Sequence, residues 1–304
     1  MTATKFSGVY AALLTPRGAD DNVDREALTR LVQFLCARGI DSFALNGATG
    51  EFCIARPQHL KGMIETAREA SDGKGQILCG IGGTSVGAVR ELAMIAEEEG
   101  AAGLLLPMPY FFRYEQQDLE AFCRAVAKST GLPILLYNLP QFSSGLEKQT
   151  VRALIEELPN IIGIKDSGGS LEILRHLTSN KVEACRIVGN DLTLRSALSE
   201  GLCDGAISGI ACVLPELILE LYARGKQAAW SEFEGGWGNL RDLAEQIESL
   251  PTPWALKWIA EARGIFQATF AQPMSKERAA RGLELQAWFR SWFSSAVPSG
   301  RIAL

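Results

Sequence analysis

The chain contains 304 residues, of which 47% are hydrophobic, and it carries a formal net charge of -5. A chain of this length can form one large α/β domain with an extension or two small domains, and its negative charge argues against nucleic acid or an anionic membrane surface as a partner. Its seven scattered cysteines include no C-x-x-C pair, and the N-terminus lacks a basic segment followed by a long apolar run, so we expect reduced thiols and a cytoplasmic location.

Eight short apolar segments, each ended by turn residues and followed by a helical pattern, occupy the first three quarters of the chain. These predicted strands span residues 9–14, 42–46, 76–81, 103–106, 133–137, 161–165, 186–188 and 205–207. Eight strand-helix units within roughly 220 residues match a (β/α)8 TIM barrel of the α/β class better than an open sheet. We therefore predict that residues 1–224 form a barrel that contains the active site.

The remaining residues, 225–304, show helical patterns that are rich in aromatic side chains. Three helices are expected, at 228–250 with an interruption at Gly235 and Gly236, at 253–263 and at 275–293. No low-complexity linker separates them from the barrel. They are predicted to form a C-terminal helical subdomain that packs against the barrel or against another subunit.

The predicted strand 161–165 ends in Lys165, and Asp166 follows it. Burial at the end of a strand removes water from the ammonium group and should lower its pKa, so that the free amine can attack a carbonyl carbon. Strand-end lysines are more often solvated or paired with a neighbouring acid, and Asp166 is such an acid. The position of Lys165 alone therefore does not decide between a Schiff-base enzyme and an ordinary ion pair.

Other polar residues also follow predicted strands and would gather at one rim, because the active site of a TIM barrel lies at the carboxyl ends of its strands. Tyr137 ends the strand before that of Lys165 and could carry protons for the same substrate atoms, although buried tyrosines usually only satisfy a local hydrogen bond. The turn Gly47-Ala48-Thr49-Gly50 can direct backbone amides at a carboxylate, although an ordinary glycine-rich turn has the same pattern. Further candidates are Thr15, Tyr110, Gly189, Asp191 and Ser208.

Metal and cofactor sites are not expected. His59 and His176 are the only histidines in the sequence, which argues against histidine-rich metal sites and histidine-based triads. In the glycine-rich run 80–87, Ser85 stands where the third glycine of a dinucleotide-binding G-x-G-x-x-G motif belongs.

Five motifs occur in an order that resembles a known family. They are Gly47-Ala48-Thr49-Gly50-Glu51, Tyr137-Asn138-Leu139-Pro140, Gly163-Ile164-Lys165-Asp166, Gly189-Asn190-Asp191 and Gly205-Ala206-Ile207-Ser208. Together they resemble the dihydrodipicolinate synthase / N-acetylneuraminate lyase superfamily, from about Phe6 to the end of the barrel and on into the helical tail.

The resemblance implies a class I aldolase or lyase that needs no metal or cofactor, in which Lys165 forms an imine with pyruvate or with the keto group of a longer 2-keto acid. It also implies that Tyr137 carries protons and that the amides of Ala48 and Thr49 hold the substrate carboxylate. It further implies that Gly189, Asp191 and Ser208 line the pocket, the last two facing substrate hydroxyls. Gly47, Tyr110 and Ile207 are further candidate substrate-binding residues. A homotetramer is expected, with pyruvate and an aldehyde as its small-molecule partners.

Three positions depart from the family pattern. Ala48 stands where the family usually has Thr or Ser, and Phe111 stands where many synthases have a second tyrosine, whose hydroxyl joins a proton relay across the subunit interface. Phe142 lies in the loop after Tyr137, where dihydrodipicolinate synthases usually carry an arginine that binds the carboxylate of aspartate semialdehyde.

A phenyl ring cannot form that charge-assisted pair. The synthase assignment is therefore weakened. The Lys165-Asp166 pair and Asp191 resemble the sugar-acid aldolases more closely, and for that reason we favour a 2-keto-3-deoxy sugar acid as the substrate. The alternatives are dihydrodipicolinate synthase activity, N-acetylneuraminate lyase activity and, from a different class, a catalytically silent barrel that binds a keto acid.

Overall fold

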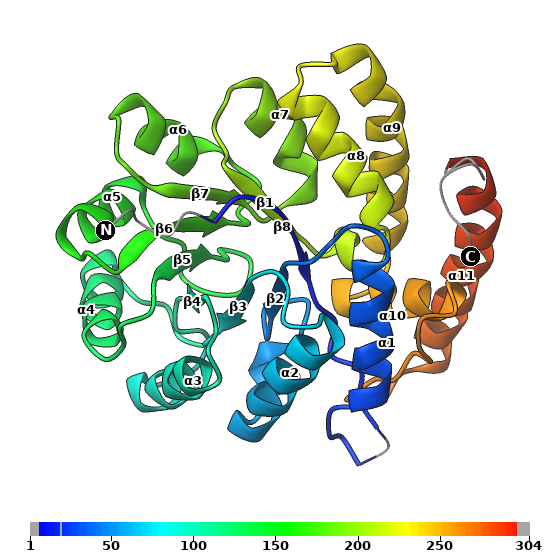
Figure 1. Ribbon diagram of the computed structural model, residues 1–304, viewed down its shortest axis with the longest axis horizontal. Coiled ribbons are helices and arrows are strands. Elements are labelled where there is room, and N and C mark those ends of the chain that lie inside the picture. Colours follow the sequence, from blue (N-terminus) through cyan, green and yellow to red (C-terminus); the bar gives the residue numbers. More distant parts are fainter. Residues whose placement is uncertain (1–5, 19, 297–304) are drawn as a thin grey trace.

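The computed structural model describes residues 6–18 and 20–296, and the ends of the two predicted domains, residues 1–5 and 297–304, lie outside the described residues. Eight parallel strands form a closed barrel in which neighbours in sequence are neighbours in space (Figure 1). The strands are β1 (Gly8–Ala12), β2 (Phe43–Leu45), β3 (Ile77–Gly80), β4 (Gly103–Pro107), β5 (Ile134–Asn138), β6 (Ile161–Asp166), β7 (Cys185–Val188) and β8 (Gly205–Ser208). The prediction of a TIM barrel is confirmed.

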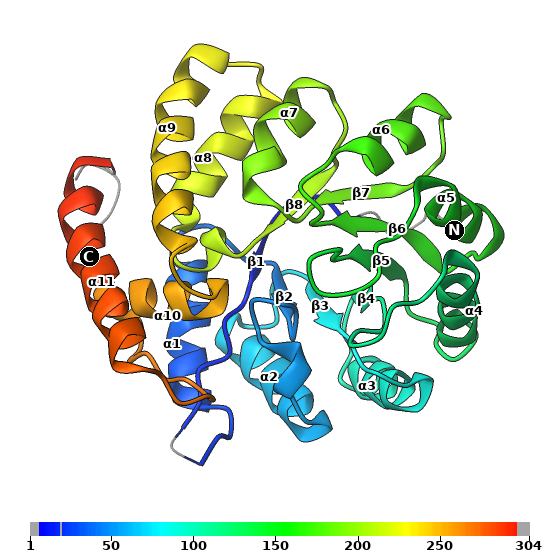
Figure 2. The same ribbon diagram turned by 180° about the vertical axis from the view of Figure 1, so that it is seen from behind.

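A helix follows each strand, and these helices surround the barrel (Figure 2). They are α1 (Arg25–Cys36), α2 (Pro57–Ala70), α3 (Val86–Glu98), α4 (Gln116–Ala127), α5 (Lys148–Glu157), α6 (Glu172–Ser179), α7 (Leu194–Ser199) and α8 (Pro215–Lys226). Local sequence explains their formation, as α1 illustrates. The Asp24 side chain caps it by accepting a hydrogen bond from Ala27 N, and Leu28, Leu31 and Leu35 lie on one buried face at helical spacing.

The strands separate two hydrophobic cores, because successive side chains of a strand point to opposite faces. Tyr137 and Ile187 belong to the core inside the barrel, whereas Leu136, Ile164 and Val188 belong to the core between strands and helices. Ile164 therefore points outward, and Lys165, the next residue of β6, points into the barrel interior. This alternation places the candidate amine at the inner rim.

Within the described residues, three more helices follow α8 and lie to one side of the barrel, beside α1 and α8 (Figures 1 and 2): α9 (Trp230–Ile247), α10 (Thr252–Ala262) and α11 (Lys276–Ala296). The predicted interruption at Gly235 and Gly236 is wrong, since α9 runs through both. A Cβ at Gly236 would lie 3.1 Å from Leu221 Cδ2 of α8, so this glycine allows α9 and α8 to approach closely. Because α8 ends at Lys226, the domain boundary at 224 falls in its last turn and remains a prediction.

None of the described helices is both long and apolar enough to cross a membrane.

Candidate active site

Lys165 and Tyr137 lie side by side at the inner rim of the barrel. They are register partners in the pairing of β6 with β5, and each is only 3% exposed. The Lys165 Nζ atom lies 3.9 Å from the centroid of the Tyr137 ring. The amine therefore rests over the face of the phenol ring, and a substrate carbon bound to this amine would lie next to the same side chain.

Asp166 is not the partner of Lys165. Its side chain points to the opposite face of β6, where its Oδ1 atom accepts hydrogen bonds from Asn138 Nδ2 and Gly168 N, both at 2.9 Å. Burial raises the pKa of the Asp166 carboxyl, and these two hydrogen bonds oppose the rise. The alternative of an ordinary ion pair between Lys165 and Asp166 is therefore wrong. Asp166 instead links the end of β6 to the end of β5 through its hydrogen bond with Asn138.

Gly189 leaves room for the stem of Lys165. A Cβ atom at this position would lie 2.1 Å from Ser167 Oγ and 2.8 Å from Lys165 Cε, distances that real Cβ atoms do not adopt. The backbone N–H of Gly189 donates to the Asp166 carbonyl at 2.8 Å and holds the end of β7 against β6. A larger residue would therefore displace the amine, the Ser167 hydroxyl or both.

Asp191 and Ser208 form a polar wall beside this amine. Asp191 begins a short 3-10 helix, Asp191–Thr193, after β7, and its carboxylate accepts hydrogen bonds from the Ser208 hydroxyl and the Ile210 amide. Burial raises the pKa of Asp191 to about 6, against the opposing effects of these hydrogen bonds and of the Lys165 charge. Ser208 is completely buried, and its Oγ also accepts from Ala211 N at 2.9 Å. The wall can accept hydrogen bonds from substrate hydroxyl groups.

The turn after β2 has the shape of an anion-binding loop. Glu51 N donates to the Ala48 carbonyl at 3.0 Å, and Thr15 Oγ1 donates to the Gly50 carbonyl at 2.8 Å. Within the described residues, the backbone amides of Ala48 and Thr49 donate no hydrogen bond, so they are available to a carboxylate. A Cβ at Gly209, which follows Ser208, would lie 3.1 Å from Thr49 Oγ1, and the turn therefore adjoins the polar wall.

Two further predicted substrate-binding residues, Tyr110 and Ile207, pack against hydrophobic neighbours. The Tyr110 ring, after β4, packs edge-on against Phe52, which follows the turn, with 5.6 Å between ring centroids. Burial raises the pKa of the Tyr110 phenol, and the nearby Cys53 adds to the rise. Ile207 is 1% exposed and packs in the interior core with Tyr137, beneath the rim. The structure thus brings the turn next to the polar wall of Asp191 and Ser208, and Tyr110 contacts the residue that follows the turn.

The comparison with known families agrees with this geometry. The model of the Dihydrodipicolinate synthetase family matches residues 5–290. The chain belongs to this family. Its members are carbon–carbon lyases and synthases of the class I aldolase type, which use pyruvate and an aldehyde, and the predictions of family and enzyme class are confirmed.

The relatives of this chain include both a synthase and a probable sugar-acid aldolase. The chain is similar to a 4-hydroxy-tetrahydrodipicolinate synthase of Aromatoleum aromaticum, at 31% identity over 83% of this chain and 87% of the relative. It is also similar to YjhH of Escherichia coli K12, a probable 2-dehydro-3-deoxy-D-pentonate aldolase, at 30% identity over 83% of each chain. The structure of E. coli YagE in complex with pyruvate superposes with a TM-score of 0.87 and 25% identity, over 95% of this chain and 99% of YagE.

Sequence reasoning missed two polar residues of this dihydrodipicolinate synthetase fold. Ser167 Oγ is buried beside Gly189 and has no hydrogen-bond partner within the described residues. Lys257 of α10 is 0% exposed and binds Glu51, the last residue of the turn. A signal for Lys257 was present, because it is the only charged residue in the apolar run 254–260, and a buried lysine needs a partner.

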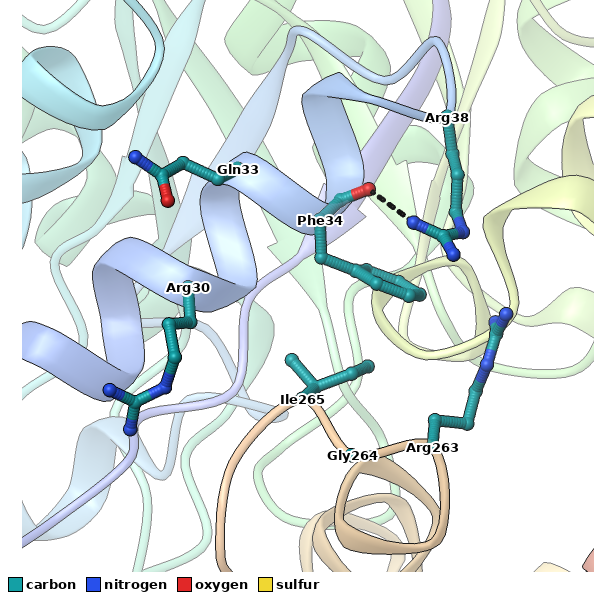
Figure 3. Close-up of a pocket in the computed structure, with 7 residues that line it drawn as sticks. All are labelled: Arg30, Gln33, Phe34, Arg38, Arg263, Gly264 and Ile265. Atoms are coloured by element: carbon teal, nitrogen blue, oxygen red, sulfur yellow. Dashed lines mark hydrogen bonds between the residues drawn. The ribbon is translucent and has the colours of Figure 1, made fainter. Parts of the chain in front are cut away.

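A separate pocket of about 420 Å³ lies between α1 and the end of α10 (Figure 3). Its lining residues are Arg30, Gln33, Phe34, Arg38, Arg263, Gly264 and Ile265. Arg38 and Arg263 both bind Glu216 of α8 there, at 2.8 and 2.9 Å. None of the residues predicted for catalysis lines this pocket, so it is not part of the candidate active site.

Proposed function

We propose that this protein is a class I aldolase that cleaves or forms the carbon–carbon bond between pyruvate and the aldehyde portion of a 2-keto-3-deoxy sugar acid. The observation that supports it most is the state of Lys165. Its amine is buried over the Tyr137 ring and forms no ion pair within the described residues, because the adjacent acid is held elsewhere. An amine in this state is suited to attack a carbonyl.

The proposed cleavage uses both side chains. Lys165 Nζ attacks the C2 carbonyl of the keto acid, and loss of water gives an iminium ion. The Tyr137 phenol supplies the proton that leaves with this water, and the phenolate formed then takes the proton of the C4 hydroxyl while the C3–C4 electron pair moves to the iminium, which releases the aldehyde and leaves an enamine. Protonation at C3 and hydrolysis of the imine then release pyruvate and restore the amine.

The surrounding residues support a polyhydroxylated acid as the substrate. The available amides of Ala48 and Thr49 would bind the C1 carboxylate, and the wall of Asp191 and Ser208 would accept hydrogen bonds from hydroxyls farther along the chain. The similarity to a probable 2-dehydro-3-deoxy-D-pentonate aldolase points to the same substrate class.

The second candidate function is condensation of pyruvate with aspartate semialdehyde. The similarity to 4-hydroxy-tetrahydrodipicolinate synthases favours it. The loop after β5 opposes it, because Phe142 is 67% exposed there and offers no positive charge to the carboxylate of the aldehyde. Activity with aspartate semialdehyde would show that this loop argument is wrong.

We also infer that the protein self-associates, with a homotetramer as the family expectation. Large aromatic side chains are exposed on the loops near the barrel rim: Phe111 at 85%, Phe112 at 65% and Phe142 at 67%. Phe111 also has a positive φ of 85°, a costly conformation for a bulky residue. Exposed apolar clusters of this kind typically mark interaction surfaces.

Borohydride reduction in the presence of pyruvate tests the imine. Mass spectrometry should find the reduced adduct on Lys165, and Lys165→Met should abolish trapping, whereas Lys128→Met, which removes an exposed lysine at the end of α4, should leave it unchanged. An unmodified Lys165 peptide would contradict the proposal. A turnover panel of 2-keto-3-deoxy acids, sialic acid and aspartate semialdehyde then separates the activities, and ligand binding without any turnover would identify a silent barrel.

A further inference from the structure

Lys257 is a completely buried lysine whose charged end meets the turn after β2. It lies in the middle of α10 among apolar residues that include Trp254, Leu256 and Ile259. Its Nζ atom is 2.5 Å from Glu51 Oε2, across 206 positions of sequence. An ammonium group without water requires an anionic partner, so burial of Lys257 and the position of Glu51 depend on each other.

Glu51 occupies a demanding position in this turn. Its φ of 59° lies in the left-handed region, which is unfavourable for a residue with a side chain and persists only where the surroundings hold it. Glu51 N and Phe52 N donate to the carbonyls of Ala48 and Gly47, at 3.0 and 3.2 Å, and close the loop that presents the free amides. The orientation of those amides therefore depends on the conformation that Glu51 adopts.

The charges of Arg17 and Asp21 also act on the Lys257–Glu51 pair. Arg17 is 2% exposed, and its Nη1 donates to the Asp21 carbonyl at 2.9 Å. Burial is the main cause that lowers the pKa of Lys257, Arg17 lowers it further, and Glu51 and Asp21 oppose this effect. The Asp21 side chain is 45% exposed, so the buried ion pair is that of Lys257 with Glu51. Removal of one member of a buried pair leaves the other uncompensated, and Glu51 would then lose the partner that holds it in place.

We propose that Lys257 is a positioning residue that sets the affinity for the substrate carboxylate by holding Glu51, and with it the turn that ends at Glu51. Lys257 itself does not touch the substrate. This inference rests on the proposed function, in which the amides of Ala48 and Thr49 bind that carboxylate. The C-terminal helices thus take part in substrate binding, because α10 carries the lysine that completes the turn.

A matched control lies in the same helix region. Arg263, just after α10, is also buried and holds Glu216 of α8 through Nη1 at 3.1 Å and Nη2 at 2.9 Å (Figure 3 shows Arg263). This pair fastens the helix to the barrel without touching the turn. If substrate binding only requires that α10 is firmly packed, Arg263→Met and Lys257→Met should raise the pyruvate concentration at half-saturation alike. If Lys257 holds the carboxylate site, only Lys257→Met should raise it.

The experiment measures borohydride trapping of Lys165 as a function of pyruvate concentration, together with Tm. For Lys257→Met we expect the pyruvate concentration at half-saturation to rise roughly ten- to hundredfold, the effect of losing a hydrogen bond to a charged group, while trapping at saturation stays within about twofold. Glu51→Gln should also raise the pyruvate concentration at half-saturation. Because the two residues act as a unit, the double variant should have the same half-saturation concentration as Lys257→Met alone. Arg263→Met should lower Tm without changing half-saturation.

The inference would be overturned if a folded Lys257→Met protein kept the half-saturation concentration of the unmodified protein. It would also be overturned if Arg263→Met changed this concentration as much as Lys257→Met does. If Lys257→Met does not fold, Glu51→Gln decides, because it keeps the shape of the side chain and removes only the charge. Failure of the proposed function is distinguishable, since the unmodified protein would then show no trapping at any pyruvate concentration.

Discussion

Gly189→Ala tests whether the geometry around Lys165 controls catalysis. The added Cβ would lie 2.1 Å from Ser167 Oγ, 2.8 Å from Lys165 Cε and 3.2 Å from Lys165 Cγ. The Ser167 hydroxyl can rotate away, but the lysine stem is 3% exposed and has little free space. Overpacking of this kind costs about 1–3 kcal/mol of stability.

The same overpacking should also slow the chemistry. A displacement of a reacting atom by about 1 Å can cost about 10²-fold in rate, so we expect kcat and the rate of borohydride trapping to fall by about that factor. Release of pyruvate from a cleaved substrate and trapping under saturating pyruvate measure the two rates, and thermal unfolding measures stability.

Two variants make the result specific. Gly62→Ala, in α2, places a Cβ where nothing lies within 4 Å, and should leave activity unchanged while raising stability by about 0.4–1 kcal/mol. Adding Ser167→Ala to Gly189→Ala removes the clash with the hydroxyl but leaves the clash with the lysine stem, so the trapping rate should stay low. If Gly189→Ala alone traps pyruvate at the rate of the unmodified protein, the inferred contact between Gly189 and the lysine stem does not control the amine.

Three further predictions concern the proton carrier, the polar wall and the association surface. Tyr137→Phe should lower kcat about 10²- to 10⁴-fold with little change in Tm, since the ring beneath the amine is kept; full activity would exclude Tyr137 as the proton carrier. Burial raises the pKa of Asp191 from 3.8 to about 6, so the folded protein binds this proton more tightly than the unfolded chain and loses stability as pH rises between these values. Asp191→Asn cannot titrate and should not show this loss. Its free energy of unfolding, relative to that of the unmodified protein, should therefore be about 2–3 kcal/mol higher at pH 8 than at pH 3.5, as denaturant titrations can measure. The same difference between the two proteins at both pH values would refute this prediction. Phe111→Ser should weaken association in sedimentation experiments, whereas Met94→Ser, at an exposed apolar position of α3, should not; an unchanged assembly would exclude Phe111 from the interface.

The sequence was sufficient to predict those features that depend on local patterns. Each short apolar run followed by a helical pattern marks one strand-helix unit, and eight of them match a barrel. Parallel strands bring their carboxyl ends to one rim, and so the placement of Lys165 beside Tyr137 was predictable from their positions at adjacent strand ends. The five motifs were sufficient for the family, because each of them lies within a few consecutive residues.

Tertiary structure decided the features that depend on side-chain direction and on contacts between distant residues. Asp166 turns away from Lys165 because neighbouring residues of a strand face opposite sides, and its hydrogen bonds to Asn138 and Gly168 become visible only once β5 and β6 are paired. Gly236 permits helix contact because of the residue of α8 that faces it. The Lys257–Glu51 pair spans 206 positions, and no local pattern encodes which buried acid a buried lysine will meet. Periodicity determines which face of an element is buried, and only packing determines what that face touches.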